Sequence, residues 1–264
     1  LALKAATWNA AQAFRLYDRG AVAPGYAADL AIMDEDFQVK LTLKDGLPVY
    51  DGAPVEIPSP EIGAGRREMA LHSFHMPAVT REQFARPGKL GVIGMIDGQI
   101  ITRLLGMAEG VDVTKDIVKI AVLERHHQTG HVGVGYLAGY GLKRGAVATS
   151  ISHDSHNLIV VGVCDEDMAC AAERVRVLGG GIVAAENGKV LSELALPIAG
   201  LMCEENAPEV REKLERLKVL ARDLGVNPAN DGKVLRCNFP YLTEGRRKEF
   251  IKVAKGKAED GRVS

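Results

Sequence analysis

The sequence predicts an α+β fold in which a sheet-and-helix domain makes up most of the chain. Short apolar runs separated by turn residues recur along the sequence and indicate β-strands. Amphipathic stretches with capping residues at their ends indicate a few helices. The 264 residues are 47% hydrophobic and 25% charged, which is typical of a soluble globular protein with one large or two small domains.

The first fifty residues predict one helix and a few short strands. Residues 1–16 are rich in alanine and carry apolar residues near i, i+3 and i+4, which indicates a helix. Strands are predicted at 30–33, 39–43 and 48–50, the first of them buried, and Asp45-Gly46 is a good hairpin-turn signal. The chain begins at Leu1 inside the helical pattern and without Met, so we expect a fragment of a longer protein.

A proline-punctuated segment, Pro54–Pro60, predicts a boundary between two domains. Beyond it, apolar runs predict the next strands, with Asp97-Gly98 as a turn between the first two. These strands cover 90–96, 100–107, 117–123, 145–151 and 158–163. Residues 133–141 hold so many glycines that no element is predicted there.

A helix and a hairpin are predicted next. Asp165 has the character of an N-cap, with acidic residues after it, and Gly179 ends that helix. The apolar runs 182–185 and 190–196 predict a hairpin whose turn is Asn187-Gly188.

The clearest helix of the chain begins at Asn206. Glu209 follows at the spacing of a capping box, and Gly225 ends the helix. An apolar stripe at helical spacing predicts the buried face, and it consists of Val210, Leu214, Leu217, Leu220 and Leu224.

Histidines gather in two clusters, His126, His127 and His131 in one and His153 and His156 in the other. The second cluster lies in the run His153-Asp154-Ser155-His156-Asn157, which is predicted as a strand–turn–strand tip. A turn needs small or Asx residues, but it does not need two imidazoles. Together the side chains offer donors, acceptors and a carboxylate–imidazole pair. The candidate site residues are therefore His126, His127, His131, His153, Asp154, His156 and Asn157.

The net charge and the cysteine content indicate which partners and which cellular compartment to expect. The net charge of −1 gives no electrostatic grip on nucleic acid or on a membrane, and no apolar run is long enough to span a bilayer. The four cysteines form no CxxC pair and are expected to be reduced thiols of a cytoplasmic protein. Neither a membrane nor a nucleic acid is expected as a partner.

The beginning of the chain resembles the C-terminal end of an amidohydrolase. The motifs that carry this resemblance are Thr7–Ala11 (TWNAA), Asp18–Leu30 (DRGAVAPGYAADL) and Lys44–Gly46 (KDG). In that superfamily the last helix of the catalytic barrel leads back into a small β-sandwich. The resemblance therefore implies that residues 1–55 are the last barrel helix and a β-sandwich segment.

A second resemblance is to the C-terminal domain of the bacterial adenine deaminase family. Its motifs occur in the family's order, and they are Glu124–Gly130 (ERHHQTG), Gly139–Ala146 (GYGLKRGA), Ser152–Asn157 (SHDSHN), Gly179–Gly181 (GGG) and Leu196–Met202 (LPIAGLM). This resemblance implies that residues 60–222 are that domain.

The last residues, 223–264, resemble ribosome recycling factor instead. The motifs are Asp223–Arg236 (DLGVNPANDGKVLR) and Phe239–Phe250 (FPYLTEGRRKEF). We expect this tail not to be an independent domain and to be poorly ordered or loosely docked from about Val226, because the rest of its own fold is missing. Its basic run from Arg246 onward is expected to be a solvated face rather than an RNA contact.

The deaminase resemblance implies a hydrolase that acts on a C–N bond of a cyclic amidine, converting adenine and water to hypoxanthine and ammonia in purine salvage. It implies a divalent metal, manganese or iron, which lowers the pKa of bound water, and a homo-oligomer. The family binds its metal on the barrel. Its HxH pair is absent here, so we expect no metal in this chain and no activity from the chain alone.

The alternative is a non-catalytic module for oligomerisation or interaction, with a ribosome-related tail. For the histidine clusters three interpretations stay open. They touch purine or support the site beside the barrel mouth, with Asp154 fixing an imidazole tautomer; they form a polar network within one domain; or they bind a transition metal incidentally. A zinc-protease site is not indicated, because Gln128 replaces the glutamate of HExxH.

Overall fold

The computed structural model describes residues 1–53, 55, 63–96, 102–152 and 155–228. The chain divides into two compact units, Leu1–Ile62 and Gly63–Ser264. All but Val55 of the predicted linker, and the predicted turn at Asp97-Gly98, lie outside the described residues.

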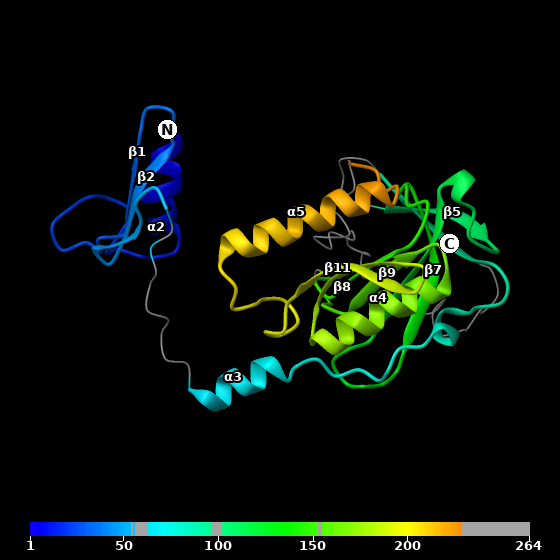
Figure 1. Ribbon diagram of the computed structural model, residues 1–264. Helices are drawn as coiled ribbons and strands as arrows, with labels where there is room; N and C mark the ends of the chain where they lie inside the picture. Colours follow the sequence, from blue (N-terminus) through cyan, green and yellow to red (C-terminus); the bar gives the residue numbers. More distant parts are fainter. Residues whose placement is uncertain (54, 56–62, 97–101, 153–154, 229–264) are drawn as a thin grey trace. The chain divides into compact units, whose positions relative to one another are not determined.

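The described part of the smaller unit holds a helical segment and a three-stranded antiparallel sheet (Figure 1). The segment consists of α1 (Ala2–Lys4), the π-helical turn η1 (Ala5–Asn9) and α2 (Ala10–Ala13). The predicted helix is thus confirmed, although it ends before residue 16 because Arg15 has a φ of 58°. The strands are β1 (Leu30–Met33), β2 (Val39–Lys44) and β3 (Leu47–Tyr50), in the order β1-β2-β3.

Asp29 ties the β2–β3 hairpin to the segment that precedes β1. Its carboxylate accepts hydrogen bonds of 2.9 Å from the Lys44 amine and the Asp45 backbone N–H, and one of 3.2 Å from Arg19. The predicted hairpin turn is confirmed, because Asp45 and Gly46 have φ values of 50° and 81°, the left-handed pair of a type I′ turn.

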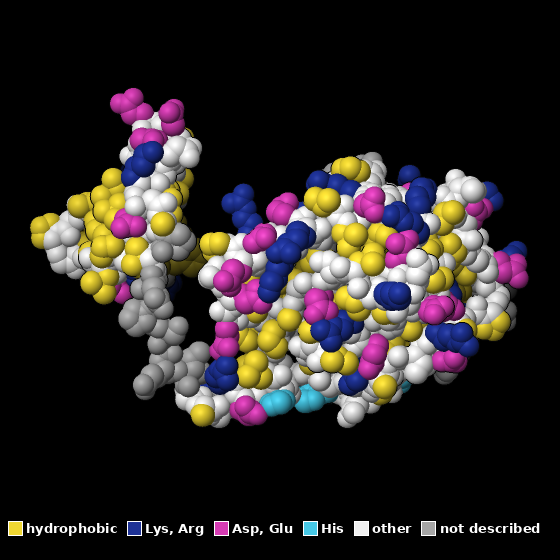
Figure 2. Space-filling model, in the orientation of Figure 1, with side chains coloured by type: hydrophobic (Ala, Val, Ile, Leu, Met, Phe, Trp, Pro, Cys, Tyr) yellow, Lys and Arg dark blue, Asp and Glu magenta, His cyan; other side chains and the backbone are white. Residues whose placement is uncertain are grey.

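Hydrophobic side chains cover much of the surface of the smaller unit (Figure 2). The prediction that 30–33 is buried is wrong, since Leu30 is only half-buried and Ile32 and Met33 are exposed. The other large exposed apolar residues of this unit include Trp8, Phe14, Leu16, Tyr17, Val22, Phe37 and Leu47. Among the described residues of this unit only Ala11 is buried, because one short sheet and one short helical segment cannot enclose a core.

The described residues of the larger unit form an eight-stranded sheet in the order β11-β10-β8-β9-β6-β7-β4-β5. Neighbouring strands run antiparallel except for β4 and β7, which are parallel. The strands are β4 (Leu90–Met95), β5 (Thr102–Ala108), β6 (Ile117–Leu123), β7 (Val132–Ala138), β8 (Ala146–Thr149), β9 (Leu158–Gly162), β10 (Gly181–Glu186) and β11 (Lys189–Ala195).

Strand β7 occupies the glycine-rich segment where no element was predicted. It lies between β6 and β4 and pairs with both, from Leu123↔Val132 to Ile117↔Ala138 on one side and at Val92↔Tyr136 on the other. Hydrogen bonding from both neighbours overcomes the weak strand propensity of its glycines. The other predicted strands of this unit are confirmed within their described residues.

Helix α4 (Asp165–Leu178) covers one face of the sheet, where alternate side chains of the central strands meet its apolar residues (Figure 1). Ala146, Ala148 and Val160 are small enough to let the helix approach, and Met168 and Val175 fill the space between them. The segment before the sheet closes the same face with Met76, Val79 and Phe84. This segment includes α3 (Ala64–Leu71) and the 3-10 turn η2 (Arg81–Phe84).

The prediction that Asp165 is the N-cap of α4 is wrong by one residue. Cys164 occupies the cap in an extended conformation, and Asp165 is the first helical residue. The carboxylate of Asp165 instead pairs with the Lys119 amine, which reaches it from β6. The predicted C-terminal end is confirmed, because Gly179 adopts the left-handed φ of 72°.

Helix α5 (Ala207–Asp223) covers the other face of the sheet with the predicted apolar stripe. Its predicted start is also confirmed, because the Asn206 side chain accepts a hydrogen bond of 3.0 Å from the Glu209 N–H. After the helix, Val226 is 2% exposed and the Asn227 N–H donates to the carbonyl of Tyr140 at 3.0 Å. Loose docking from Val226 was therefore the wrong expectation for Val226 and Asn227, and 229–264 lies outside the described residues.

Two remaining features complete the described fold. The 3-10 turn η3 (Val113–Lys115) precedes β6, and the predicted turn at Asn187-Gly188 joins β10 to β11 with φ values of 53° and 68°. No helix within the described ranges is both long and apolar enough to cross a membrane.

Candidate functional site

The loop that joins β8 to β9 carries the second predicted histidine cluster. The two strands pair antiparallel, with Thr149 opposite Ile159, so the strand–turn–strand prediction is confirmed. The loop is not a simple solvent-exposed tip, however. Ser150 and Ser152 are buried, Ser155, His156 and Asn157 are half-buried, and His153 and Asp154 lie outside the described residues.

The loop after β6 carries the first histidine cluster and is organised by Glu124. The Glu124 carboxylate accepts hydrogen bonds from the backbone N–H groups of His126, His127 and Thr129 and from the Thr129 hydroxyl. Burial by itself would raise the pKa of Glu124, but these hydrogen bonds outweigh it and lower the pKa to about 2. Glu124 is therefore an ionised acceptor that fixes the loop.

The two predicted clusters meet, although they are separated in sequence. The His126 imidazole Nε2 lies 2.8 Å from the carbonyl oxygen of Ser155. The neighbouring Arg125 donates from Nε to the carbonyl of His156. The loop after β6 and the β8–β9 loop therefore form one continuous surface at the same end of the sheet.

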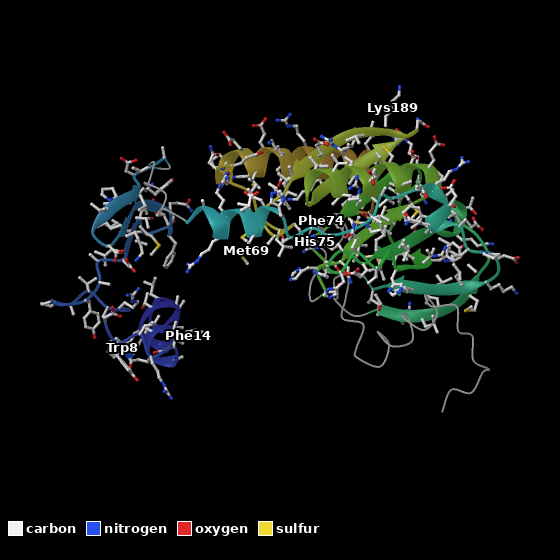
Figure 3. All side chains as sticks on the ribbon, turned by 90° about the horizontal axis from the view of Figure 1, so that it is seen from below. Trp8, Phe14, Met69, Phe74, His75 and Lys189 are labelled. Carbon is white, nitrogen blue, oxygen red and sulfur yellow. The ribbon has the colours of Figure 1, made fainter. Side chains whose placement is uncertain are left out.

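Two further segments reach this surface. Phe74 and His75 lie side by side beyond the end of α3 (Figure 3), and the His75 N–H donates to the Arg125 carbonyl at 2.8 Å. The Arg125 guanidinium lies over the Phe74 ring, 4.9 Å from its centroid, and Nη2 donates to the carbonyl of Ala199 at 3.1 Å. Arg125 thus contacts three segments that are distant in sequence.

Backbone around Gly181 and Gly200 packs closely against the start of the β8–β9 loop. The Ser150 hydroxyl donates to the Gly200 carbonyl at 2.6 Å and accepts from the Gly181 N–H at 2.8 Å. A Cβ on Gly180 would lie 2.3 Å from the Cα of Gly200, so the two segments can approach this closely only because residue 180 is glycine. The GGG and LPIAG motifs thus meet each other and the Ser150 side chain beside the histidine loop.

The predicted site residues differ in their surroundings. His126, His127 and His131 are exposed, whereas His156 and Asn157 are half-buried. The Asn157 Oδ1 atom is buried and accepts no hydrogen bond from the described residues. His72 and His75 are both exposed, and His72 contacts Glu68 at 2.6 Å.

Metal binding by the described side chains is not supported by their arrangement. Within the described ranges no three His, Cys, Asp or Glu residues come together as metal ligands. The imidazoles of His126 and His127 are tilted neighbours with ring centroids 6.3 Å apart. The donor set that the structure describes therefore does not fit a catalytic metal.

Three residues of this site were not among the predicted ones, namely Arg125, Glu124 and Phe74. Arg125 and Glu124 stand inside the ERHHQTG motif, so a charged pair just before the histidines was an available signal. Arg125 is 3% exposed, which no local pattern indicates. Phe74 comes from a segment about fifty residues earlier and has no signal of its own.

Comparison with known proteins gives two family matches. The model of the amidohydrolase family matches residues 1–49, and the model of the adenine deaminase C-terminal domain matches residues 99–239. The second match contains every described strand of the large sheet except β4, together with α4, α5 and both histidine loops. The chain belongs to the adenine deaminase family.

Relatives in several bacteria agree with this assignment. The chain is 41% identical over 245 residues to adenine deaminase 2 of Carboxydothermus hydrogenoformans, covering 87% of this chain and 42% of that protein. It is 42% identical over 237 residues to the adenine deaminase of Brucella suis, covering 84% of this chain and 39% of that protein. It is 41% identical over 237 residues to adenine deaminase 1 of Rhizobium meliloti, covering 84% of this chain and 40% of that protein. The chain spans about two fifths of the length of these relatives.

These comparisons do not support the resemblance of residues 223–264 to ribosome recycling factor. The adenine deaminase domain match instead continues through residue 239. The described end of this region agrees with that, because Leu224 and Val226 belong to the same buried cluster as α5.

Proposed function

We propose that this chain functions as part of an adenine deaminase, which hydrolyses adenine to hypoxanthine and ammonia. The observation that carries this proposal is the 41–42% identity to proteins named adenine deaminase over most of the chain. That similarity spans both the amidohydrolase match at the beginning and the C-terminal domain match. The substrate class is accordingly adenine, and the reaction is hydrolysis of its exocyclic C–N bond.

The catalytic metal of such an enzyme, manganese or iron, has no fitting ligand set among the described residues. We place its ligands in the part of the relatives that this chain does not match, and we expect residues 1–264 by themselves to be inactive. A bound metal would supply hydroxide at neutral pH. No step of the reaction is assigned to the chain through that metal.

The contribution that we assign to this chain is the surface formed by the two histidine loops. It holds the exposed His126 beside the half-buried His156, and Glu124 and Arg125 fix these residues through backbone hydrogen bonds. Imidazole is suited to hydrogen bonding with a purine or to proton transfer near neutral pH. The half-buried Asn157 lies in the same loop, and its buried Oδ1 accepts no hydrogen bond from the described residues.

The proposal also includes the chain's setting. With reduced cysteines, we expect a cytoplasmic enzyme. The three described cysteines are free, which is compatible with that setting. We further expect the enzyme to be a homo-oligomer, with adenine as its small-molecule partner.

The test is a fusion protein. The part of Carboxydothermus hydrogenoformans adenine deaminase 2 that precedes the region matched by this chain is joined to residues 1–264. Ammonia release from adenine is then measured with manganese and with iron. The fusion should turn over adenine, while the isolated chain and the isolated preceding part should not. A soluble fusion that melts cooperatively but releases no ammonia would count against the proposal, as would activity of the isolated chain.

A further inference from the structure

Three backbone positions around Arg125 adopt an unfavourable conformation. Among the described residues, eight non-glycine residues have a positive φ, and three of them meet here: Gln128 at 54°, His156 at 48° and Ala199 at 56°. The left-handed region is uncommon for residues other than glycine, although His enters it more readily than Ala does. Such conformations persist where surrounding contacts enforce them, and they concentrate at functional sites.

Arg125 supplies those contacts for two of the three residues. Its Nε donates to the carbonyl of His156, and its Nη2 donates to the carbonyl of Ala199. The planar guanidinium presents its donors in a rigid fork, so it fixes the two carbonyls relative to each other. The two left-handed residues are therefore clamped by one side chain.

Neighbouring residues also pack against the remaining sides of the Arg125 guanidinium. Phe74 lies against its face, and Gly200 packs so closely that a Cβ there would be 2.9 Å from Nη1. Burial lowers the pKa of Arg125, and no acidic side chain among the described residues offsets this effect. A buried cation satisfied by carbonyl oxygens is costly to maintain for stability alone.

Arg125 and its two hydrogen bonds to His156 and Ala199, which we call the Arg125 clamp, lie next to both histidine loops. Residue 125 precedes His126 in the chain, so Arg125 joins the first histidine loop to the backbone of His156 in the second. The His126 imidazole makes the neighbouring link to Ser155. Loss of the guanidinium would remove its hydrogen bonds to the carbonyls of His156 and Ala199 and its contact with Phe74 at once.

We propose that Arg125 is a positioning residue that holds the His126 and His156 loops in the orientation required for adenine hydrolysis. The catalytic part of this inference rests on the proposed function, whereas the clamp itself can be tested on the chain alone. Arg125 acts through the backbone of His156 and Ala199, and contact with the substrate is not required of it.

The first experiment is hydrogen–deuterium exchange of the full chain, comparing wild type with Arg125→Met. Exchange in 72–77, 155–157 and 197–201 should accelerate together, on the order of tenfold or more, because local opening no longer breaks the hydrogen bonds of the Arg125 guanidinium. Arg144→Met is the matched control. Arg144 also binds a backbone carbonyl, that of Asp223 at 2.6 Å, but it lies near the other end of β8.

The control should leave exchange in those three segments at the wild-type rate. Unchanged exchange in Arg125→Met, or equal acceleration in Arg144→Met, would overturn the clamp. If Arg125→Met does not fold, Arg125→Lys replaces it. A lysine keeps the charge but cannot present the forked donors, so acceleration should be intermediate.

The second experiment places the same substitutions in the fusion protein and separates kcat from KM for adenine. Arg125→Met should lower kcat roughly ten- to a hundredfold with KM little changed, and Arg125→Lys should recover part of the loss. Wild-type kcat in a variant with accelerated exchange would overturn the catalytic role. An inactive wild-type fusion would contradict the proposed function instead, and the exchange comparison would still decide the clamp.

Discussion

The His126 imidazole and the Ser155 carbonyl oxygen lie 2.8 Å apart, and this contact joins two histidine clusters that the sequence separates by about thirty residues. It brings the loop after β6 and the β8–β9 loop to one surface. On this surface Glu124 and Arg125 hold the backbone, while the His126 imidazole is exposed and His156 is half-buried.

Glu124→Gln should destabilise the larger unit by about 1–3 kcal/mol at pH 7, because a neutral amide replaces an acceptor that binds three backbone N–H groups. The carboxylate pKa is lowered from 4.5 to about 2, so its ionised form is favoured by folding. This stability is fully present above pH 4.5 and is lost as the pH falls towards 2.

The measurement is urea unfolding of wild type and Glu124→Gln between pH 7 and pH 3. The difference between the two proteins should shrink as the pH falls below 4.5. Glu212→Gln serves as control, since the Glu212–Arg216 pair on α5 is exposed and should contribute little. A pH-independent difference for Glu124→Gln would mean that its charge does not matter.

Gly200→Ala should destabilise the larger unit by about 1–3 kcal/mol, because the new methyl group meets both Arg125 and Phe74 and the φ of 70° disfavours alanine. Gly88→Ala separates these two causes. Gly88 has a φ of 83° but no atom within 4 Å of its Cβ position. Equal melting temperatures for the two variants would show that the contact with Arg125 is unimportant.

Leu217→Ala should lower the free energy of unfolding by about 2–5 kcal/mol, since Leu217 is fully buried between α5 and the sheet. Val219 lies on the exposed side of the same helix, and Val219→Ala should change stability by less than about 0.5 kcal/mol. Denaturant unfolding of both variants measures the difference. Similar values would contradict the packing of α5 described above.

Removal of metal should not change the stability of the isolated chain, because no three potential ligands meet within the described ranges. The melting temperature in excess manganese should equal that in a chelator, since an ion that binds the folded state would raise it. A clear rise of the melting temperature in manganese would instead support the interpretation that the histidine clusters bind a transition metal incidentally. His126→Gln would then locate it.

Much of the fold was predictable from local signals. Asp45-Gly46, Asn187-Gly188, Gly179 and Asn206 each specify a turn or cap through their own backbone preferences, and all four are confirmed. Strand β7 was not predictable in this way. Its glycines carry a weak local signal, and pairing with β4 and β6 decides its conformation.

The candidate site was predictable only in part. The two histidine loops could be named because imidazoles at strand ends are unusual, but their contact depends on the strand order of the sheet. The roles of Phe74 and Ala199 depend on segments that are distant in sequence and meet around Arg125. Such long-range packing leaves no periodic pattern in the sequence.

The central claim is that the histidine loops act in adenine hydrolysis, and His156→Gln in the fusion protein tests it most directly. A lost hydrogen bond to a charged or transition-state group is worth roughly 1.5–3 kcal/mol, or about ten- to a hundredfold in rate. His156→Asn is measured beside it, because asparagine tolerates the φ of 48° and isolates the loss of imidazole. His72→Gln, at an exposed histidine, is the control.

The measurement is kcat/KM for adenine together with the melting temperature of each variant. We predict that both His156 variants lose about ten- to a hundredfold in kcat/KM, with a melting temperature close to that of the wild-type fusion and of His72→Gln. Unchanged kcat/KM with a lowered melting temperature would contradict the account and make the β8–β9 loop a purely structural element.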